Sequence, residues 1–318
     1  MPTLVVNQGA IGDLLLSLPA LRLIRKYKGD FTLAAKPENG LFLKALGECS
    51  SVIPSTATAF SELYSGVIHP ILTYFDDIWW FTRRRGLVPT ILMMPDSEKK
   101  ANVVFTVDEG PSETNCSVFQ FDMVKGYLAV DDSISAFLYP IKYSRPFEER
   151  KLFDLAIHPG SGSKKKNLSL ESFFEISDRL LKKYPHLKIL YILGPAEEEL
   201  TKDVESYALK KDGQVKILKG QELGTVAYTL GQTKFFLGND SGISHLAAWC
   251  GTDTVMLFAP TNPRLWAPIL TNVTYIFSKA RCSPCGEKYR DCKESLCLDE
   301  LDINEIEKML LKKMKASK

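Results

Sequence analysis

The sequence predicts an α/β protein with two Rossmann-like domains. Three observations support this fold class. The chain has 318 residues, which is enough for two domains of ordinary size. Short apolar runs that read as buried strands alternate with segments of helical periodicity, as expected for a parallel sheet covered by helices. A charged stretch containing Pro146, Ile141–Leu152, separates the two halves, and we expect the interdomain linker there.

Composition excludes several classes of protein. The chain is 45% hydrophobic and 25% charged, which is typical of a soluble globular protein. Its net charge of +2 is too small for a nucleic-acid-binding surface, so we expect no nucleic-acid partner. No apolar run is long enough to span a bilayer, and the N-terminus lacks the charged region of a signal peptide. Seven cysteines, an odd number, argue against a secreted disulfide framework, so the cytoplasm is the expected compartment.

The first half begins with an apolar strand at Leu4–Val6. Apolar or strand-like runs follow at Phe31–Ala35, Val52–Pro54, Pro70–Tyr74, Thr90–Met94 and Asn102–Val107, and helices are expected at Asp13–Lys28, Leu41–Leu46 and Cys116–Val130. Pro19 can kink the first of these helices because it removes one N–H. The aromatic and arginine cluster at Asp76–Arg85 has two readings: a membrane or anion-contacting surface, or a core-anchored helix with a solvated basic end.

The loop after the first strand, Asn7–Asp13, contains two glycines but not the GxGxxG pattern of dinucleotide-binding proteins. A Rossmann dehydrogenase is therefore poorly supported. On its residues alone, Asp13 is best read as a cap of the helix that follows, where a carboxylate is favoured by the positive end of the helix dipole.

The second half repeats the alternation of strands and helices. Strands are expected at Phe153–His158, Leu187–Leu193, Val215–Leu218, Lys234–Leu237 and Thr254–Phe258. Helices are expected at Leu170–Tyr184, beginning at Glu197, starting at Gln221–Thr225, over Ile243–Cys250 and at Leu301–Met314. The last helix has Ile303, Ile306, Leu310 and Met314 on one stripe.

Two loops of this half carry residues suited to binding an anion. Asp240 and Ser241 stand where a strand leads into a helix N-terminus, whose free N–H groups and dipole attract anions; the alternative is that they only cap the helix. His245 falls on the same helix face. Lys164–Lys166 follow the Gly/Ser loop at Gly160–Ser163, a position that favours phosphate contact over a merely solvated charge run.

The stretch DSGISHLAA at Asp240–Ala248, with APTNP at Ala259–Pro263 and WAP at Trp266–Pro268, resembles the donor-site signature of the ADP-heptose:lipopolysaccharide heptosyltransferases. The N-terminal Gly9-x-x-Gly12-Asp13 followed by Ser17–Leu21 resembles a second motif of this family, glycosyltransferase family nine. The resemblance implies a GT-B fold, two Rossmann-like α/β/α domains facing across a cleft. It also implies that the C-terminal helix returns to the first domain.

The resemblance assigns roles to particular residues. Asp13 would be the catalytic base, and Lys166 would contact the leaving diphosphate. The donor would be held by Gly160, Ser161, Glu197, Gln221, Asp240, Ser241, Gly242 and His245. In the family an aromatic residue is common two places after this Lys, whereas this chain has Leu168 there. This departure concerns the specificity for the sugar.

The implied reaction is inverting, metal-independent transfer of heptose from ADP-heptose to the lipopolysaccharide inner core, a lipid A–Kdo acceptor. Residues 1–146 would bind the acceptor and 147–300 the nucleotide-sugar, with a C-terminal helix at 301–318. The expected location is cytoplasmic, with peripheral attachment to the inner face of the cytoplasmic membrane as a further option. Two alternatives stay open: transfer to a protein or another glycan, and a nucleotide-sugar binding protein without catalysis.

Four cysteines in the second domain follow the spacing Cys282-x2-Cys285-x6-Cys292-x4-Cys297. Such a group is a candidate structural site for zinc or iron, and the alternative is reduced thiols or adventitious disulfides. Similar cysteine-bearing tails occur among relatives of the family. Catalysis itself is expected to need no cofactor.

Overall fold

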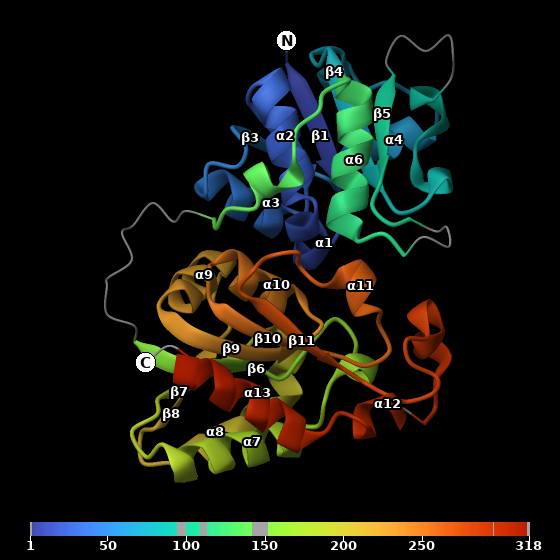
Figure 1. The fold of residues 1–318 in the computed structure, drawn as a ribbon. Helices are drawn as coiled ribbons and strands as arrows, with labels where there is room; N and C mark the ends of the chain where they lie inside the picture. The colour runs from blue at the N-terminus through green and yellow to red at the C-terminus, as the bar shows by residue number, and fades with distance from the viewer. Residues whose placement is uncertain (1, 94–99, 109–112, 142–151, 295, 317–318) are drawn as a thin grey trace. The chain divides into compact units, whose positions relative to one another are not determined.

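A computed structural model describes residues 2–93, 100–108, 113–141, 152–294 and 296–316 (Figure 1). The chain divides into two compact units, residues 1–139 and 140–318. Each unit contains one parallel β-sheet with helices on both faces. The expected linker at Ile141–Leu152 falls almost wholly outside the described residues.

The sheet of the first unit has the strand order β3-β2-β1-β4-β5, and all of its neighbouring strands are parallel. Its strands are β1 (Thr3–Asn7), β2 (Phe31–Ala35), β3 (Ser51–Pro54), β4 (Asp77–Thr82) and β5 (Ala101–Phe105). Strand β1 is buried along its whole length, as expected for a central strand covered on both faces.

Helices cover both faces of this sheet, and two adjacent tryptophans of β4 show how. Trp80 packs near Phe60 of α4, whereas the ring of Trp79 meets that of Tyr127 of α6 edge-on. The helices are α1 (Ile11–Leu16), α2 (Leu18–Lys28), α3 (Pro37–Ala45), α4 (Thr58–Tyr64), α5 (Pro70–Thr73) and α6 (Cys116–Leu128), with 3-10 turns η1 (Arg85–Leu87), η2 (Thr90–Leu92) and η3 (Ile134–Phe137).

The sheet of the second unit has the order β11-β10-β9-β6-β7-β8 and is also parallel throughout its described pairs. Its strands are β6 (Phe153–His158), β7 (Ile189–Leu193), β8 (Val215–Lys219), β9 (Thr233–Asn239), β10 (Asp253–Phe258) and β11 (Val273–Phe277).

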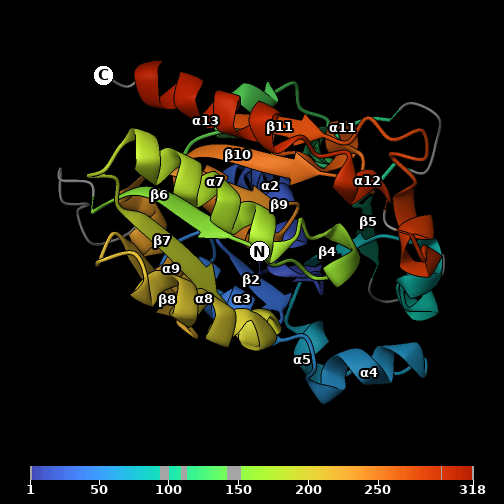
Figure 2. The same cartoon turned by 90° about the horizontal axis from the view of Figure 1, so that it is seen from below.

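One face of this sheet is covered by α7, α8 and α13, which lie in front of the strands in Figure 2. The other face is covered by α9 and α10. The helices are α7 (Leu170–Lys183), α8 (Thr201–Leu209), α9 (Leu223–Gly231), α10 (Gly242–Trp249), α11 (Pro263–Trp266), α12 (Leu296–Asp299) and α13 (Ile303–Ala316), with 3-10 turns η4 (Lys164–Lys166), η5 (Pro195–Leu200) and η6 (Gly286–Asp291).

The C-terminal helix α13 packs into the core of the second unit. Ile306, Leu310 and Met314 are buried there, as their stripe predicts. The helix therefore belongs to the second unit. The expectation that it returns to the first domain is wrong for this chain.

The sequence predicted most strands and helices at their observed positions. Three predictions are wrong. Pro70–Tyr74, expected to be strand-like, forms α5. The described part of Thr90–Met94, residues 90–93, contains the turn η2 and no strand. Most of the cluster at Asp76–Arg85 forms strand β4 in place of the helix of the second reading. Pro19 does not kink a continuous helix, because the predicted helix is divided at Ser17 into α1 and α2. Pro19 lies in the first turn of α2, where its missing N–H has no cost.

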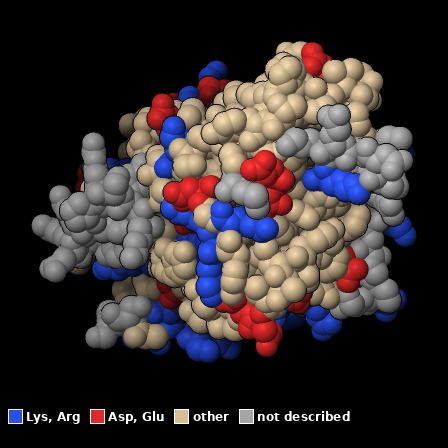
Figure 3. Space-filling view, turned by 90° about the horizontal axis from the view of Figure 1, so that it is seen from above, with Lys and Arg blue, Asp and Glu red and all other residues tan. Residues whose placement is uncertain are grey.

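The surface carries charges of both signs. On the face drawn in Figure 3, Lys and Arg lie intermixed with Asp and Glu, without a broad field of one sign. Among the described residues, no helix combines the length and the apolar character that crossing a membrane requires.

Candidate functional site

The two anion-suited loops predicted from the sequence lie side by side in the second unit. Strands β6 and β9 are neighbours, and His158 at the end of β6 pairs with Gly238 near the end of β9. The chain order reverses between these strands, because β7 and β8 extend to one side and β10 and β11 to the other. Ligands of open parallel sheets bind at the carboxyl ends of strands at such a reversal.

Lys166 joins the two loops. Its ammonium Nζ donates to the backbone oxygen of Asp240 at 2.9 Å and to the carboxylate Oδ2 of Asp240 at 3.1 Å. Thr261, in the loop after β10, donates its hydroxyl to the same Oδ2 at 2.8 Å. The positive charge of Lys166 is thereby held at the N-terminus of α10.

The other two lysines of the run point elsewhere. Lys164 pairs with Glu199, and Lys165 donates to the backbone oxygen of Arg290. The Lys166 side chain is only 15% exposed, against 76% for that of Lys164. The geometry thus favours Lys166 as the residue that faces the helix N-terminus.

Asp240 is only 7% exposed and stays ionised. Burial by itself would raise the pKa of this carboxyl, but the neighbouring His245, the Lys166 ammonium and the Thr261 hydroxyl lower the pKa well below its usual range. The carboxylate and its partners form a fixed polar group next to the helix N-terminus.

The N-terminus of α10 is capped by Ser241, whose Oγ accepts from the Ser244 N–H at 3.3 Å. The capping role foreseen for this residue is therefore real. His245 is buried one turn along, with Nε2 3.7 Å from Asp240 Oδ1. Its Nδ1 has no hydrogen-bond partner within the described part of the chain. Gly242 is the first residue of the helix.

The loop after β6 is closely packed. A Cβ atom on Gly160 would lie 1.8 Å from Glu197 Oε1, so any larger residue there would require the Glu197 side chain to move. The Ser161 hydroxyl lies 2.6 Å from Asn167 Oδ1 and accepts from the Ser163 N–H at 3.2 Å. Ser161 thus stabilises the turn that leads to Lys166.

Glu197 is buried behind this loop. Its Oε2 accepts from the Gly194 N–H at 2.8 Å, and its Oε1 lies 4.0 Å from His158 Nε2. His158 Nδ1 lies 3.0 Å from the Ile192 carbonyl oxygen, which can only accept. Burial lowers the pKa of His158, although the Glu197 charge acts in the opposite direction, so the imidazole is neutral at pH 7.

The predicted donor residue Gln221 lies apart from this group. Gln221 follows the edge strand β8, is exposed, and donates to the Lys219 carbonyl; β6 and β7 separate its strand from β9. Leu168, which replaces the expected aromatic residue, is buried in the core of the unit. Its side chain is therefore a packing residue in this structure.

Asp13 belongs to the first unit and sits in the first turn of α1, after β1. Its Oδ2 accepts from the Ala10 N–H at 2.9 Å. A Cβ atom on Gly9 would come within 2.7 Å of Asp13 Cβ, so glycine permits this close turn. Strand β1 also borders a reversal of strand order, since β2 and β4 flank it.

Cys282, Cys285, Cys292 and Cys297 line one cavity of about 390 Å³ in the second unit. Burial raises the pKa of Cys285 and of Cys297, and the neighbouring thiols add to this rise. Thiolates suit zinc or iron, but no three Cys, His, Asp or Glu side chains in the described ranges converge closely enough to hold an ion. The arrangement of Cys282, Cys285, Cys292 and Cys297 thus does not support the predicted structural metal.

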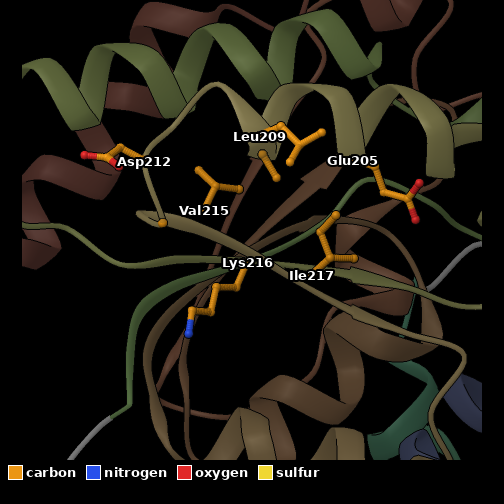
Figure 4. A pocket seen from close by; sticks show the side chains of 8 residues that line it. Glu205, Leu209, Asp212, Val215, Lys216 and Ile217 are labelled. Carbon is orange, nitrogen blue, oxygen red and sulfur yellow. The ribbon is translucent and has the colours of Figure 1, made fainter.

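A larger hollow of about 800 Å³ lies elsewhere, between α8 and the edge strand β8 (Figure 4). Leu209, Val215 and Ile217 are among the residues that line it, while Lys216 points away from the helix. It contains none of the predicted site residues and lies at the amino end of β8. We do not assign the site to it, because the ligand-binding loops of parallel sheets follow the carboxyl ends of strands.

Sequence reasoning missed two members of the site. Thr261 lies within a stretch that carries the family resemblance and Asn239 directly precedes one, but neither received a role. Asn239 hydrogen-bonds the loop after β6 through both atoms of its amide, and Thr261 holds Asp240. A polar residue at the end of an apolar strand, directly before Asp240, was the available signal for Asn239.

Comparison with known proteins agrees with this geometry. The chain is 28% identical over 120 residues to lipooligosaccharide heptosyltransferase 2 of Campylobacter jejuni, a match that covers 36% of this chain and 37% of that protein. The matched region thus spans about two fifths of the length of this relative.

Solved structures show the same fold over the whole chain. One is the E. coli heptosyltransferase WaaC with ADP, at 16% identity, 98% coverage of this chain, 100% coverage of that chain and a TM-score of 0.71. Another is the iron-containing dodecameric glycosyltransferase TibC of enterotoxigenic E. coli, at 13% identity, 100% coverage of this chain, 76% coverage of that chain and a TM-score of 0.63. The predicted GT-B class, with two Rossmann-like units, is confirmed.

The sequence profile named Glycosyltransferase family 9 (heptosyltransferase) matches residues 123–295, more than half of the chain. The matched region contains the loop with Lys166 and the turn with Asp240. The chain therefore belongs to glycosyltransferase family 9, the heptosyltransferase family.

Proposed function

We propose that this protein is an inverting, metal-independent glycosyltransferase that transfers heptose from ADP-heptose to the lipopolysaccharide inner core. The observation that carries the proposal is the placement of the Lys166 ammonium at the N-terminus of α10, beside Asp240. Family membership and the names of the relatives, a lipooligosaccharide heptosyltransferase and a heptosyltransferase with ADP, support the choice of donor and acceptor.

The second unit would bind the diphosphate of the donor. Two N–H bonds of Lys166 point at Asp240, which leaves the third for a phosphate oxygen. The first N–H groups of α10 add hydrogen bonds and a positive dipole end. As the sugar–phosphate bond breaks, negative charge grows on the departing ADP, and a preorganised positive site stabilises that charge.

The first unit would bind the acceptor, with Asp13 as the general base. In the proposed step, an acceptor hydroxyl oxygen forms a bond to the anomeric carbon on the side opposite the ADP. The bond from that carbon to the diphosphate oxygen breaks, ADP leaves with the electron pair, and the hydroxyl proton passes to the Asp13 carboxylate. A single in-line displacement of this kind inverts the anomeric centre.

We further propose that the protein attaches peripherally to the inner membrane surface, where a lipid-linked acceptor is found. Five of the fourteen large apolar side chains exposed in the described ranges lie between Tyr64 and Leu87. We call Tyr64, Val67, Ile71, Tyr74 and Leu87 the α4–α5 patch. Residues 64–74 include no Lys, Arg, Asp or Glu, and aromatic and aliphatic side chains of this kind favour the membrane interface.

Calorimetric titration of the purified protein with ADP, UDP, GDP and NAD tests the donor site. We expect selective ADP binding that is at least about tenfold weaker in Lys166→Ala, since one charge-assisted contact is lost. Lys164→Ala is the matched control, because Lys164 lies two residues away but pairs with Glu199. A preference for UDP or GDP would discard heptose, and binding of none of these nucleotides would overturn the donor site.

The acceptor is tested by mass spectrometry after incubation with ADP-heptose. A heptose mass shift on heptose-deficient lipopolysaccharide is the expected result. A shift on a protein or another glycan instead would move the enzyme to the alternative acceptor class. Donor binding without any transfer, and with no effect of Asp13→Ala, would indicate a nucleotide-sugar binding protein without catalysis.

A further inference from the structure

Asn239 is the last residue of β9 and directly precedes Asp240, and its side chain uses both ends of its amide. The Nδ2 group donates to the backbone oxygen of Pro159 at 2.7 Å. The Oδ1 atom accepts from the backbone N–H of Leu168 at 3.0 Å. Pro159 and Leu168 stand immediately before and after residues 160–167, so one amide closes both ends of the loop that carries Lys166.

This role requires an amide. An aspartate would place a second acceptor against the Pro159 oxygen, and an apolar side chain would satisfy neither group. Asn239, Pro159 and Leu168 are all buried, with Asn239 at 0% exposure. Without the amide, a buried carbonyl and a buried N–H would lose their partners, which is costly in a protein interior.

Asn239 is itself fixed to the start of α10. Its backbone oxygen accepts from the Ser244 hydroxyl at 2.6 Å. A Cβ atom on the preceding Gly238 would lie 2.8 Å from that hydroxyl, so glycine permits the close approach of strand and helix. Asn239 therefore connects the helix N-terminus, through its backbone, to the loop after β6, through its side chain.

We infer that Asn239 is a positioning residue, which holds Lys166 at the N-terminus of α10 by fixing both ends of the loop at residues 160–167. The pairing of β6 with β9 extends to His158 and Gly238, so it does not hold that loop. Beyond it, the described bonds from the loop to the β9–α10 turn are those of Asn239 and Lys166. The inference rests on the proposed function only in taking the bound anion to be the diphosphate of the donor.

The consequence is a loss of affinity without loss of a phosphate contact. If the amide is removed, the loop samples other conformations, and apparent affinity falls in proportion to the competent fraction. A competent population of about one tenth would weaken ADP binding about tenfold. Because Asn239 acts through Lys166, its effect should be smaller once Lys166 is gone.

The test compares Asn239→Ala with Asn272→Ala in the full chain. Asn272 is a matched control, because its Nδ2 also bonds two backbone oxygens, those of Ala248 at 2.8 Å and Thr252 at 2.7 Å, at the other end of α10. Two quantities are measured: hydrogen–deuterium exchange of residues 160–168, and the Kd for ADP by calorimetry. Melting temperatures identify the stability cost of each variant.

We expect Asn239→Ala to accelerate exchange over residues 160–168 and to weaken ADP binding about tenfold, while Asn272→Ala leaves both unchanged. The double variant Asn239→Ala/Lys166→Ala should bind no more weakly than Lys166→Ala alone within about twofold. If Asn239→Ala does not fold, Asn239→Ser, which leaves a small polar side chain, takes its place.

Unchanged exchange and affinity in the Asn239 variant would overturn the inference, and so would an equal loss in the Asn272 variant. Failure of the wild-type protein to bind ADP would instead refute the proposed function. In that case the exchange comparison still decides whether Asn239 holds the loop, so the two failures are distinguishable.

Discussion

Asp13 shows how one carboxylate can serve two roles that sequence alone cannot separate. Its Oδ2 accepts from the Ala10 N–H, which is the capping role expected for an acidic residue in a first helical turn. A carboxylate has two oxygens and several acceptor sites, so capping does not prevent it from accepting a proton. Structure and stability are therefore poor guides to the catalytic role proposed for it, and a substitution must separate that role from capping.

Asparagine at position 13 makes this separation. Asp13→Asn keeps an oxygen that accepts from Ala10, so stability should change little. Asp13→Ala loses the cap and should lower the free energy of unfolding by about 1 kcal/mol. Because only the carboxylate can act as base, both variants should lose about 100-fold or more in transfer rate. Initial rates and denaturant unfolding measure the two effects.

ADP affinity is the control, since neither change touches the second unit. Wild-type affinity with a greatly reduced rate would support the general base. Transfer by Asp13→Asn at the wild-type rate would instead leave Asp13 as a helix cap alone.

At the scale of elements, two of the three wrong predictions came from short apolar runs, Pro70–Tyr74 and Thr90–Met94. Pro70–Tyr74 reads equally well as strand or helix, since four or five apolar residues show no usable period. The structure selects α5 through Pro70 at its first turn and the His69 ring, whose Nδ1 accepts from the Ile71 N–H. By contrast, α7 and α13 repeat their apolar stripes over several turns, and their positions were predictable.

The α4–α5 patch supplies a prediction at this scale. Val67→Ser with Tyr74→Ser should reduce binding to vesicles of anionic phospholipid about tenfold, because two exposed apolar side chains would no longer enter the interface. Tyr74 is 70% exposed, so its loss should cost the fold little. Co-sedimentation with the vesicles measures the partition.

The matched control changes an exposed aliphatic and an exposed aromatic residue outside the patch, Leu209→Ser with Tyr275→Ser. Equal loss in both double variants would mean that general surface hydrophobicity, and not the patch, governs binding. If the patch variant bound vesicles as well as the wild type, the α4–α5 patch would not be the membrane-binding surface.

At the scale of the whole molecule, the sequence predicted the position of the candidate site better than the hydrogen bonds that hold its loops in place. The alternation of strands and helices predicted two parallel sheets. The position of Asp240 and Lys166 followed from the rule that the loops at the carboxyl ends of parallel strands bind ligands. The hydrogen bonds of Asn239 could not be predicted, because Pro159 and Leu168 lie about 80 and 71 residues away along the chain. Only the pairing of β6 with β9 brings them together.

The proposed reaction also implies that transfer requires no divalent cation. A magnesium ion on a diphosphate is normally held by carboxylates. In this site the carboxylate at the helix N-terminus, Asp240, already accepts from Lys166 and Thr261. In the proposed reaction, the Lys166 ammonium and the N–H groups of α10 would supply the positive charge that a cation would otherwise bring.

We therefore expect initial transfer rates in excess EDTA to stay within about twofold of those in Mg²⁺, since the stabilising charge belongs to the protein itself. Metal analysis of the treated enzyme verifies that chelation was complete. Lys166→Ala sharpens the test: if Lys166 replaces a cation, added Mg²⁺ should restore part of the activity of this variant but leave the wild type unchanged. If the wild-type enzyme were inactive in EDTA and recovered its activity with Mg²⁺, Lys166 and α10 would not suffice to stabilise the leaving diphosphate. The diphosphate would then be released as a metal complex.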